Sequence, residues 1–104
     1  MAKRLFISQP MRGKSDEEII RERETAVRAV QEHLHDEVVL IDSFFQGAPA
    51  GASPLWYLGE SLKLLATADV ACFATGWLNA RGCRIEHTCA IEYGIQTMEI
   101  DDIL

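Results

Sequence analysis

The stretch at residues 4–15, RLFISQPMRGKS, decides the fold of this chain. Its run LFI at 5–7 is contiguous and apolar, which is typical of a strand covered on both faces. The proline and glycine that follow require the strand to end near Gln9. Ser15 then predicts the start of a helix, because its spacing to Glu18 is that of a capping box. The stretch therefore predicts a central parallel strand that leads into a helix through a short loop.

The predicted helix after Ser15 runs to about His35. Its apolar residues recur at steps of three and four and form one stripe: Ile19, Ala26, Val27, Val30 and Leu34. The charged run RERE at 21–24 is expected to form a solvated face with ion pairs four residues apart.

Buried strands and helices continue to alternate along the chain. Further strands are predicted at 38–41, 70–74 and 96–100, and further helices at 54–67 and from about Gly82 onward. This order predicts an α/β fold in which a parallel sheet carries helices on both faces. Residues 1–104 are enough for a single domain of this kind.

A long loop is predicted at residues 44–54, where small residues, glycines and prolines gather. Loops of this length in small domains are often functional. Phe44 and Phe45, together with Trp56, are expected either to offer a face to a planar ring or to cap the core.

The composition excludes several classes of function. A net charge of −6 opposes binding to nucleic acid polymers and to anionic membranes. The longest apolar runs are too short to cross a bilayer, and the first residues lack the pattern of a signal peptide, so a cytoplasmic protein is expected. Cys72, Cys83 and Cys89 contain no C-x-x-C pair, and neither a disulfide framework, a metal site nor a cofactor is predicted.

Two loops follow predicted strands at the edge of the sheet where parallel α/β folds bind ligands. In the first loop, Ser8, Gln9 and Arg12 lie beside Gly13 and just before a helix N-terminus. Such a position suits an anion such as phosphate. A tight turn with an exposed arginine is the alternative.

In the second loop, Gly76 and Gly82 permit close approach of the backbone to a ligand. The helix that follows places Glu86 with Ala90 and Tyr93 along one face. A carboxylate there is able to attack an electrophilic sugar carbon and form a covalent glycosyl intermediate. An exposed helix residue is the alternative reading of Glu86.

Two segments carry a family resemblance. ISQPMRG, and ADVACFATGW followed by NARGCRIEHTCAIEYG, resemble the nucleoside 2-deoxyribosyltransferase superfamily, in particular its short branch described as a domain of unknown function. The resemblance covers nearly the whole chain, and the block G-W-x-x-x-R-G-x-x-x-E-H is its most specific part. It implies a flavodoxin-like three-layer αβα sandwich with a sheet of four to five strands.

The resemblance also implies an activity: cleavage or transfer at the N-glycosidic bond of a nucleoside or nucleoside 5′-monophosphate, in the ribo or deoxy form. Glu86 matches the family's nucleophile, and residues 9–13 match the phosphate loop of deoxynucleoside monophosphate N-hydrolases. The residues expected to contact the substrate are Ser8, Gln9, Met11, Arg12, Gly13, Ser61, Gly76, Trp77, Asn79 and Gly82. A small-molecule nucleoside or nucleotide partner and a homo-oligomer, a dimer or larger, are further implications.

Three family positions are changed in this chain. Phe6 replaces a tyrosine that contacts the catalytic glutamate, Ser61 replaces an aspartate and has Glu60 beside it, and Ala80 replaces an aspartate used for the base. These changes keep two alternatives open: a nucleotide-binding module without turnover, and a glycohydrolase for NAD or an ADP-ribose-type ligand. By its spacing Tyr93 is expected near Glu86, whereas His87 is expected at the surface or in an interface.

Overall fold

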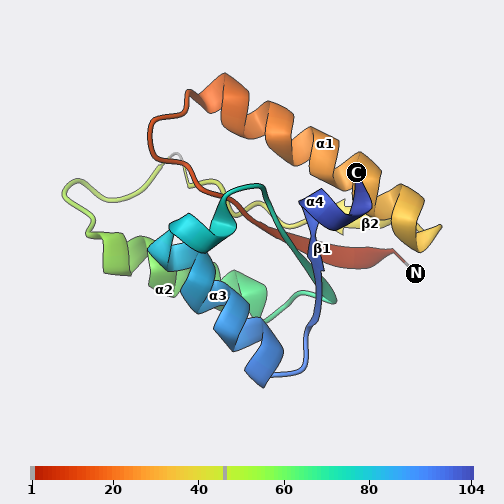
Figure 1. Cartoon of the computed structure of the whole chain (residues 1–104). Helices are drawn as coiled ribbons and strands as arrows, with labels where there is room; N and C mark the ends of the chain where they lie inside the picture. Colours follow the sequence, from red (N-terminus) through yellow and green to blue (C-terminus); the bar gives the residue numbers. More distant parts are fainter. Residues whose placement is uncertain (1, 46) are drawn as a thin grey trace.

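The computed structural model describes residues 2–45 and 47–104. Strands and helices alternate along the chain in the order that the sequence predicts (Figure 1). The elements are β1 (Lys3–Ser8), α1 (Asp16–Leu34), β2 (Val38–Leu40), α2 (Pro54–Leu65), β3 (Val70–Phe73), the 3-10 turn η1 (Trp77–Asn79), α3 (Arg81–Glu92), β4 (Gln96–Glu99) and α4 (Ile100–Ile103). The short elements η1 and α4 were not anticipated from the sequence.

The sheet has four strands, all parallel, in the order β2-β1-β3-β4. Helices α1 and α4 cover one face, and α2 and α3 cover the other (Figure 1). The predicted flavodoxin-like α/β sandwich is thereby confirmed, with four strands. The chain leaves β1 toward one face through α1 and leaves β3 toward the other through α3, so the two loops diverge where a ligand site is expected.

Side chains of β1 alternate between the two layers of the core. Leu5 and Ile7 pack on the α1 side, whereas Phe6 packs on the side of α2 and α3. The same alternation directs Ser8 toward α3 and Gln9 toward α1. The end of this strand therefore supplies one polar side chain to each layer.

Helix α1 begins as predicted. The Ser15 side chain accepts a hydrogen bond from the Glu18 N–H, and the Glu18 side chain accepts one in return from the Ser15 N–H. Of the predicted apolar stripe, Ile19, Ala26 and Val30 are buried, and the other two members pack against the core.

The charged run at 21–24 departs from the prediction. Arg23 is only 4% exposed, so it does not belong to a solvated face. Its guanidinium donates to the Gln9 Oε1 at 3.0 Å, the Ile41 carbonyl at 3.0 Å and the Ser43 hydroxyl at 3.1 Å. The reason lies in helix periodicity, because position 23 falls on the apolar stripe between Ile19 and Ala26.

The ion pairs of this region also differ from the expectation. Glu22 pairs with Lys14, across the loop, at 2.8 Å. Among the residues that the structure describes, no ion pair joins positions four apart on α1.

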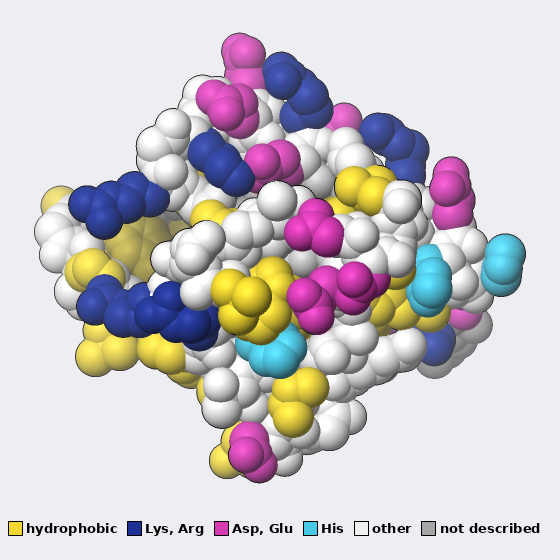
Figure 2. Space-filling view, viewed as in Figure 1, with side chains coloured by type: hydrophobic (Ala, Val, Ile, Leu, Met, Phe, Trp, Pro, Cys, Tyr) yellow, Lys and Arg dark blue, Asp and Glu magenta, His cyan; other side chains and the backbone are white. Residues whose placement is uncertain are grey.

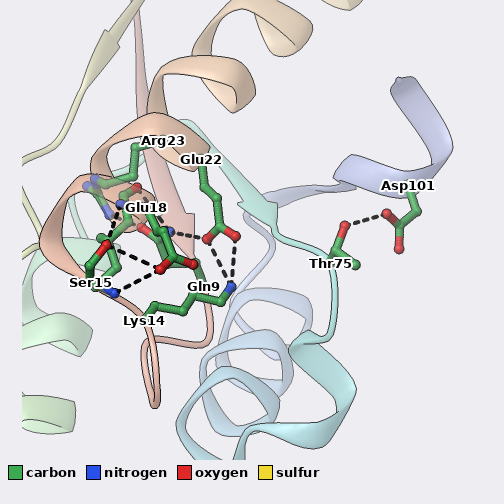
Figure 3. A network of polar contacts seen from close by, with 9 residues as sticks. Gln9, Lys14, Ser15, Glu18, Glu22, Arg23, Thr75 and Asp101 are labelled. Carbon is green, nitrogen blue, oxygen red and sulfur yellow. Dashed lines mark hydrogen bonds and ion pairs between the residues drawn. The ribbon is translucent and has the colours of Figure 1, made fainter.

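The loop after β3 is tied to the C-terminal elements. The Thr75 hydroxyl donates to an Asp101 carboxylate oxygen at 2.6 Å (Figure 3), and the Trp77 indole N–H donates to Glu99 at 3.2 Å. These bonds hold the start of the second loop against β4 and α4. No helix in the described part of the chain has both the length and the apolar character needed to cross a bilayer.

Replacing Arg23 by methionine is predicted to lower the free energy of unfolding by about 2–4 kcal/mol, because buried acceptors lose a charged donor. Relief of burying the guanidinium offsets only part of this loss, since three acceptors are left without their donor. Urea unfolding measures the change. Arg21→Met, at an exposed position of the same helix, is the matched control. Equal stability of Arg23→Met and the wild type would mean that the three hydrogen bonds of Arg23 do not stabilise the fold.

Candidate functional site

Ser8 and Glu86 meet at the carboxyl edge of the sheet. Ser8 ends β1, and Glu86 lies in the second turn of α3, 78 positions later in the chain. The Ser8 hydroxyl donates to the Glu86 Oε1 at 2.6 Å. Both side chains are buried, with Ser8 2% and Glu86 7% exposed. The structure therefore places Glu86 in the interior, not on an exposed helix face.

A cavity of about 300 Å³ opens beside this pair. Polar groups from both layers reach it, and aromatic and aliphatic side chains form most of its wall. Its lining consists of Phe6, Ile7, Ser8, Gln9, Pro10, Met11, Ser43, Phe44, Phe45, Pro54, Tyr57, Leu58, Ser61, Ala80, Gly82, Cys83 and Glu86. Glu86 is the one carboxylate among these residues. A mostly apolar hollow with a few converging polar groups is typical of a small-molecule site.

Burial raises the pKa of Glu86 above its ordinary value of 4.5, and the hydroxyls of Ser8 and Ser61 oppose that rise by stabilising the carboxylate. Desolvation is the larger of these effects. A carboxyl group with a perturbed pKa in a cavity is a marker of functional sites. The group is desolvated, and it is held by a hydroxyl at a fixed position.

The cysteines play a packing role. Burial raises the pKa of Cys72 to about 12, and burial together with the nearby Glu86 raises the pKa of the Cys83 thiol. Cys83 lines the cavity, but a thiol with a raised pKa is a poor nucleophile.

Gln9 is held by α1. Its amide nitrogen donates to the Ile19 carbonyl at 3.3 Å and to Glu22 at 3.0 Å, and its amide oxygen accepts from Arg23. Figure 3 shows this network with Lys14 closing it through Glu22. The amide of Gln9 is thus used to fix the first loop, although the residue also lines the cavity.

A second hollow of about 520 Å³ adjoins the cavity. It shares Pro10, Met11, Ala80 and Gly82 with the cavity, and its remaining lining is Arg12, Gly76, Asn79, Arg81 and Arg84. We refer to it as the arginine groove. Figure 2 shows Lys and Arg side chains gathered where the β1–α1 loop and the start of α3 lie.

The predicted site residues are thus divided between two adjoining hollows. Ser8, Gln9 and Ser61 line the cavity with Glu86, whereas Arg12, Gly76 and Asn79 line the arginine groove; Met11 and Gly82 line both. Gly13 lines neither hollow, and its φ of +80° lets the loop turn directly after Arg12.

Two further expectations, for Trp77 and Tyr93, differ from the structure. Trp77 does not line the cavity, because it is 9% exposed and packs on Phe73 in the core. His87, which was expected at the surface or in an interface, is half-buried and stacks on Trp77 with the ring centroids 4.3 Å apart. Tyr93 is 84% exposed at the far end of α3, where the helix ends, and lines a different groove from Glu86.

The aromatic residues of the long loop contribute to the cavity wall. Phe44 and Phe45 line it together with Tyr57 from α2. Phe45 packs edge-on against Trp56, with the ring centroids 6.1 Å apart, and Trp56 itself does not line the cavity. Phe44 and Phe45 are therefore part of the cavity wall.

Sequence reasoning missed Arg81 and Arg84 as members of the site. Both lie in the same block as Glu86, and their spacing of three places them on one face at the start of a helix. That spacing, in the segment of Gly76 and Gly82, was the signal from which a basic site could have been predicted. Among the described residues, no group of three or more His, Cys, Asp or Glu side chains is arranged to hold a metal ion.

No protein-family model matches the chain, and no curated protein matches it.

The pKa of Glu86 leads to a prediction about stability. Because its folded pKa is raised, Glu86 contributes stability that is present below about pH 4.5 and is lost as the pH rises through the folded pKa. Glu86→Gln keeps an acceptor for Ser8 and removes the buried charge. The variant is therefore predicted to gain stability relative to the wild type as the pH rises from about 4.5 to neutrality.

Urea unfolding of both proteins across this pH range measures the difference. Glu92→Gln, at an exposed position of α3, subtracts the general effect of losing one carboxylate. A difference between Glu86→Gln and the wild type that stays constant with pH would exclude the raised pKa.

Proposed function

We propose that the cavity is the active site of an enzyme that cleaves or transfers at the N-glycosidic bond of a nucleoside or nucleoside 5′-monophosphate. One observation carries the proposal: the buried Glu86 carboxylate faces the cavity, and Ser8 holds it at 2.6 Å. The resemblance of the loop at 9–13 and of the block around Glu86 to the nucleoside 2-deoxyribosyltransferase superfamily supports it.

The proposed chemistry uses Glu86 as the nucleophile. Its free carboxylate oxygen attacks the anomeric carbon of the sugar and forms a glycosyl ester, and the electron pair of the C–N bond leaves with the base. The base nitrogen takes a proton from water. Water or a second acceptor base then attacks the anomeric carbon, and the Glu86 carboxylate is released.

The proposed substrate has a place for each of its parts. The sugar lies beside Ser8, Ser61 and Glu86, and the base lies against Phe44 and Phe45, where aromatic faces suit a planar ring. The 5′-phosphate extends past Met11, which lines both hollows, into the arginine groove, where Arg12 binds it.

The changed family positions are compatible with this scheme. Phe6 has no hydroxyl, but Ser8 lies two residues later on the same strand face and supplies the bond to Glu86. Ser61 lies on the cavity wall, where its hydroxyl stabilises the carboxylate. Glu60 does not replace the missing aspartate, because it pairs with Lys63 at 2.8 Å and does not line the cavity.

A nucleotide-binding module without turnover is the second candidate. It is favoured by Ala80, which stands where the family has an aspartate for the base, and by the fact that no second carboxylate is found among the described residues of the cavity wall. Nucleotide binding without base release, measured by calorimetry beside the activity assay, would select this candidate.

Two further parts of the proposal do not depend on the site. A cytoplasmic location is proposed from the sequence pattern, and a homo-oligomer, a dimer or larger, is proposed from the resemblance. Sedimentation of the purified protein measures its oligomeric state.

The test of turnover is base release from nucleosides, their 5′-monophosphates and NAD, in ribo and deoxy forms, followed by chromatography. Glu86→Gln is predicted to lower base release on the order of a thousand-fold or more, because a nucleophile has no substitute within the site. Glu92→Gln is the control and is expected to retain full activity. Full activity of Glu86→Gln would exclude Glu86 as the nucleophile.

Ser8→Ala is predicted to lower the rate by about 10- to 100-fold, as expected for loss of a hydrogen bond to a charged group. It is also predicted to move the acidic limb of the pH–rate profile to higher pH, because the Ser8 hydroxyl stabilises the Glu86 carboxylate. A lower rate with an unmoved profile would mean that Ser8 has a packing role only.

A further inference from the structure

The arginine groove is larger than a single phosphate requires. Arg12 comes from the first loop, whereas Arg81 and Arg84 come from the first turn of α3, so the groove is bordered by guanidinium groups from two segments. The protein carries 16 acidic against 10 basic residues, yet none of the residues that line this groove is acidic. The basic character of the groove is therefore local and opposes the net charge of the protein.

The guanidinium groups of the groove retain donors for a ligand. Within residues 2–45 and 47–104, neither Arg12 nor Arg81 forms an ion pair, and no side-chain hydrogen bond joins either to another described residue. Arg84 donates one N–H to the Leu78 carbonyl at 2.9 Å, and this bond holds the Arg84 side chain beside η1. The other N–H donors of its guanidinium are left for a ligand. The N-cap Ala80 offers no side-chain acceptor to the first turn of α3, so the positive end of the helix dipole adds to these charges.

The direction of the groove connects it to the catalytic cavity. The groove adjoins the cavity and shares Pro10, Met11, Ala80 and Gly82 with it. On the proposed function, a nucleoside with its sugar at Glu86 extends its 5′ group across this shared lining into the groove. Arg12 lies on the first loop and is enough to bind a single phosphate. Arg81 and Arg84 line the same groove from the first turn of α3, so the groove holds two guanidinium groups besides the one on the first loop.

We infer that the groove binds the second phosphate of a 5′-diphosphate group, and that the substrate is a nucleoside 5′-diphosphate or a nucleotide with a diphosphate bridge. This inference rests on the proposed function for the position of the sugar. Arg12 binds the phosphate next to the sugar, and Arg81 and Arg84 bind the outer phosphate, where arginine matches phosphate oxygens in pairs. A diphosphate carries more negative charge than a monophosphate and so complements the three guanidinium groups of the groove.

Binding of inorganic pyrophosphate and inorganic phosphate, measured by calorimetry, tests the groove without any turnover. Pyrophosphate is expected to bind the wild type at least about ten-fold more tightly than phosphate, a difference of about 1.4 kcal/mol. Arg81→Gln with Arg84→Gln is expected to remove this preference. Arg81→Gln alone, which breaks no hydrogen bond described for the native fold, is expected to reduce it, and Arg28→Gln on the exposed face of α1 is the control.

Competition among nucleosides, their 5′-mono- and 5′-diphosphates, ADP-ribose and NAD identifies the source of the diphosphate. Tighter binding of free diphosphates supports a nucleoside diphosphate, and tighter binding of ADP-ribose or NAD supports a bridged diphosphate. Equal binding of mono- and diphosphates by the wild type, or equal weakening of both in the double variant, would overturn the inference. If pyrophosphate binds but no base is released from any compound, the groove stands and the proposed catalysis fails.

Discussion

A buried guanidinium holds together the edge of the sheet on which the site is built. Arg23 reaches from α1 to Gln9 after β1 and to Ile41 and Ser43 after β2, so one side chain fixes two strand ends against a helix. Burial lowers its pKa, and the nearby Asp42 opposes that effect. Such a group is costly to bury, and it is retained where its directed donors specify a geometry that apolar packing leaves free. The first loop therefore starts from a fixed point.

Strand alternation then separates support from chemistry. At the end of β1, Gln9 points to α1 and is used by the scaffold, whereas Ser8 points to α3 and meets Glu86. A shift of one residue in the register of β1 would exchange these two side chains between the layers. The pairing of Ser8 with Phe73 of β3 sets that register. The position of the carboxylate in the cavity thus depends on backbone pairing as much as on α3.

The fold and the edge that carries the site were predictable from local patterns, because strand runs, the Ser15 cap and the glycine loops act over a few residues. The burial of Arg23 and of Trp77 was not predictable, because it depends on contacts between segments far apart in the chain. The charged run around Arg23 indicates a solvated surface, but helix periodicity places Arg23 itself on the apolar stripe. The position of Trp77 in a loop predicts a ligand contact, whereas in the structure η1 directs its side chain into the core against Phe73. Sequence periodicity places a side chain on a face, and tertiary packing decides what that face meets.

The raised pKa of Glu86 and the arginine groove are linked on the proposed function. A nucleophilic carboxylate must be ionised, yet burial already disfavours its charge, and an anionic substrate bound nearby would disfavour it further. Guanidinium groups that line the adjoining groove oppose that effect, since their positive charge offsets the negative charge of a phosphate bound there. A chain with a net charge of −6 has no general surplus of positive charge to do this. On the proposed function, arginines gathered beside the cavity therefore oppose the further rise in the pKa of Glu86 that a bound phosphate would cause.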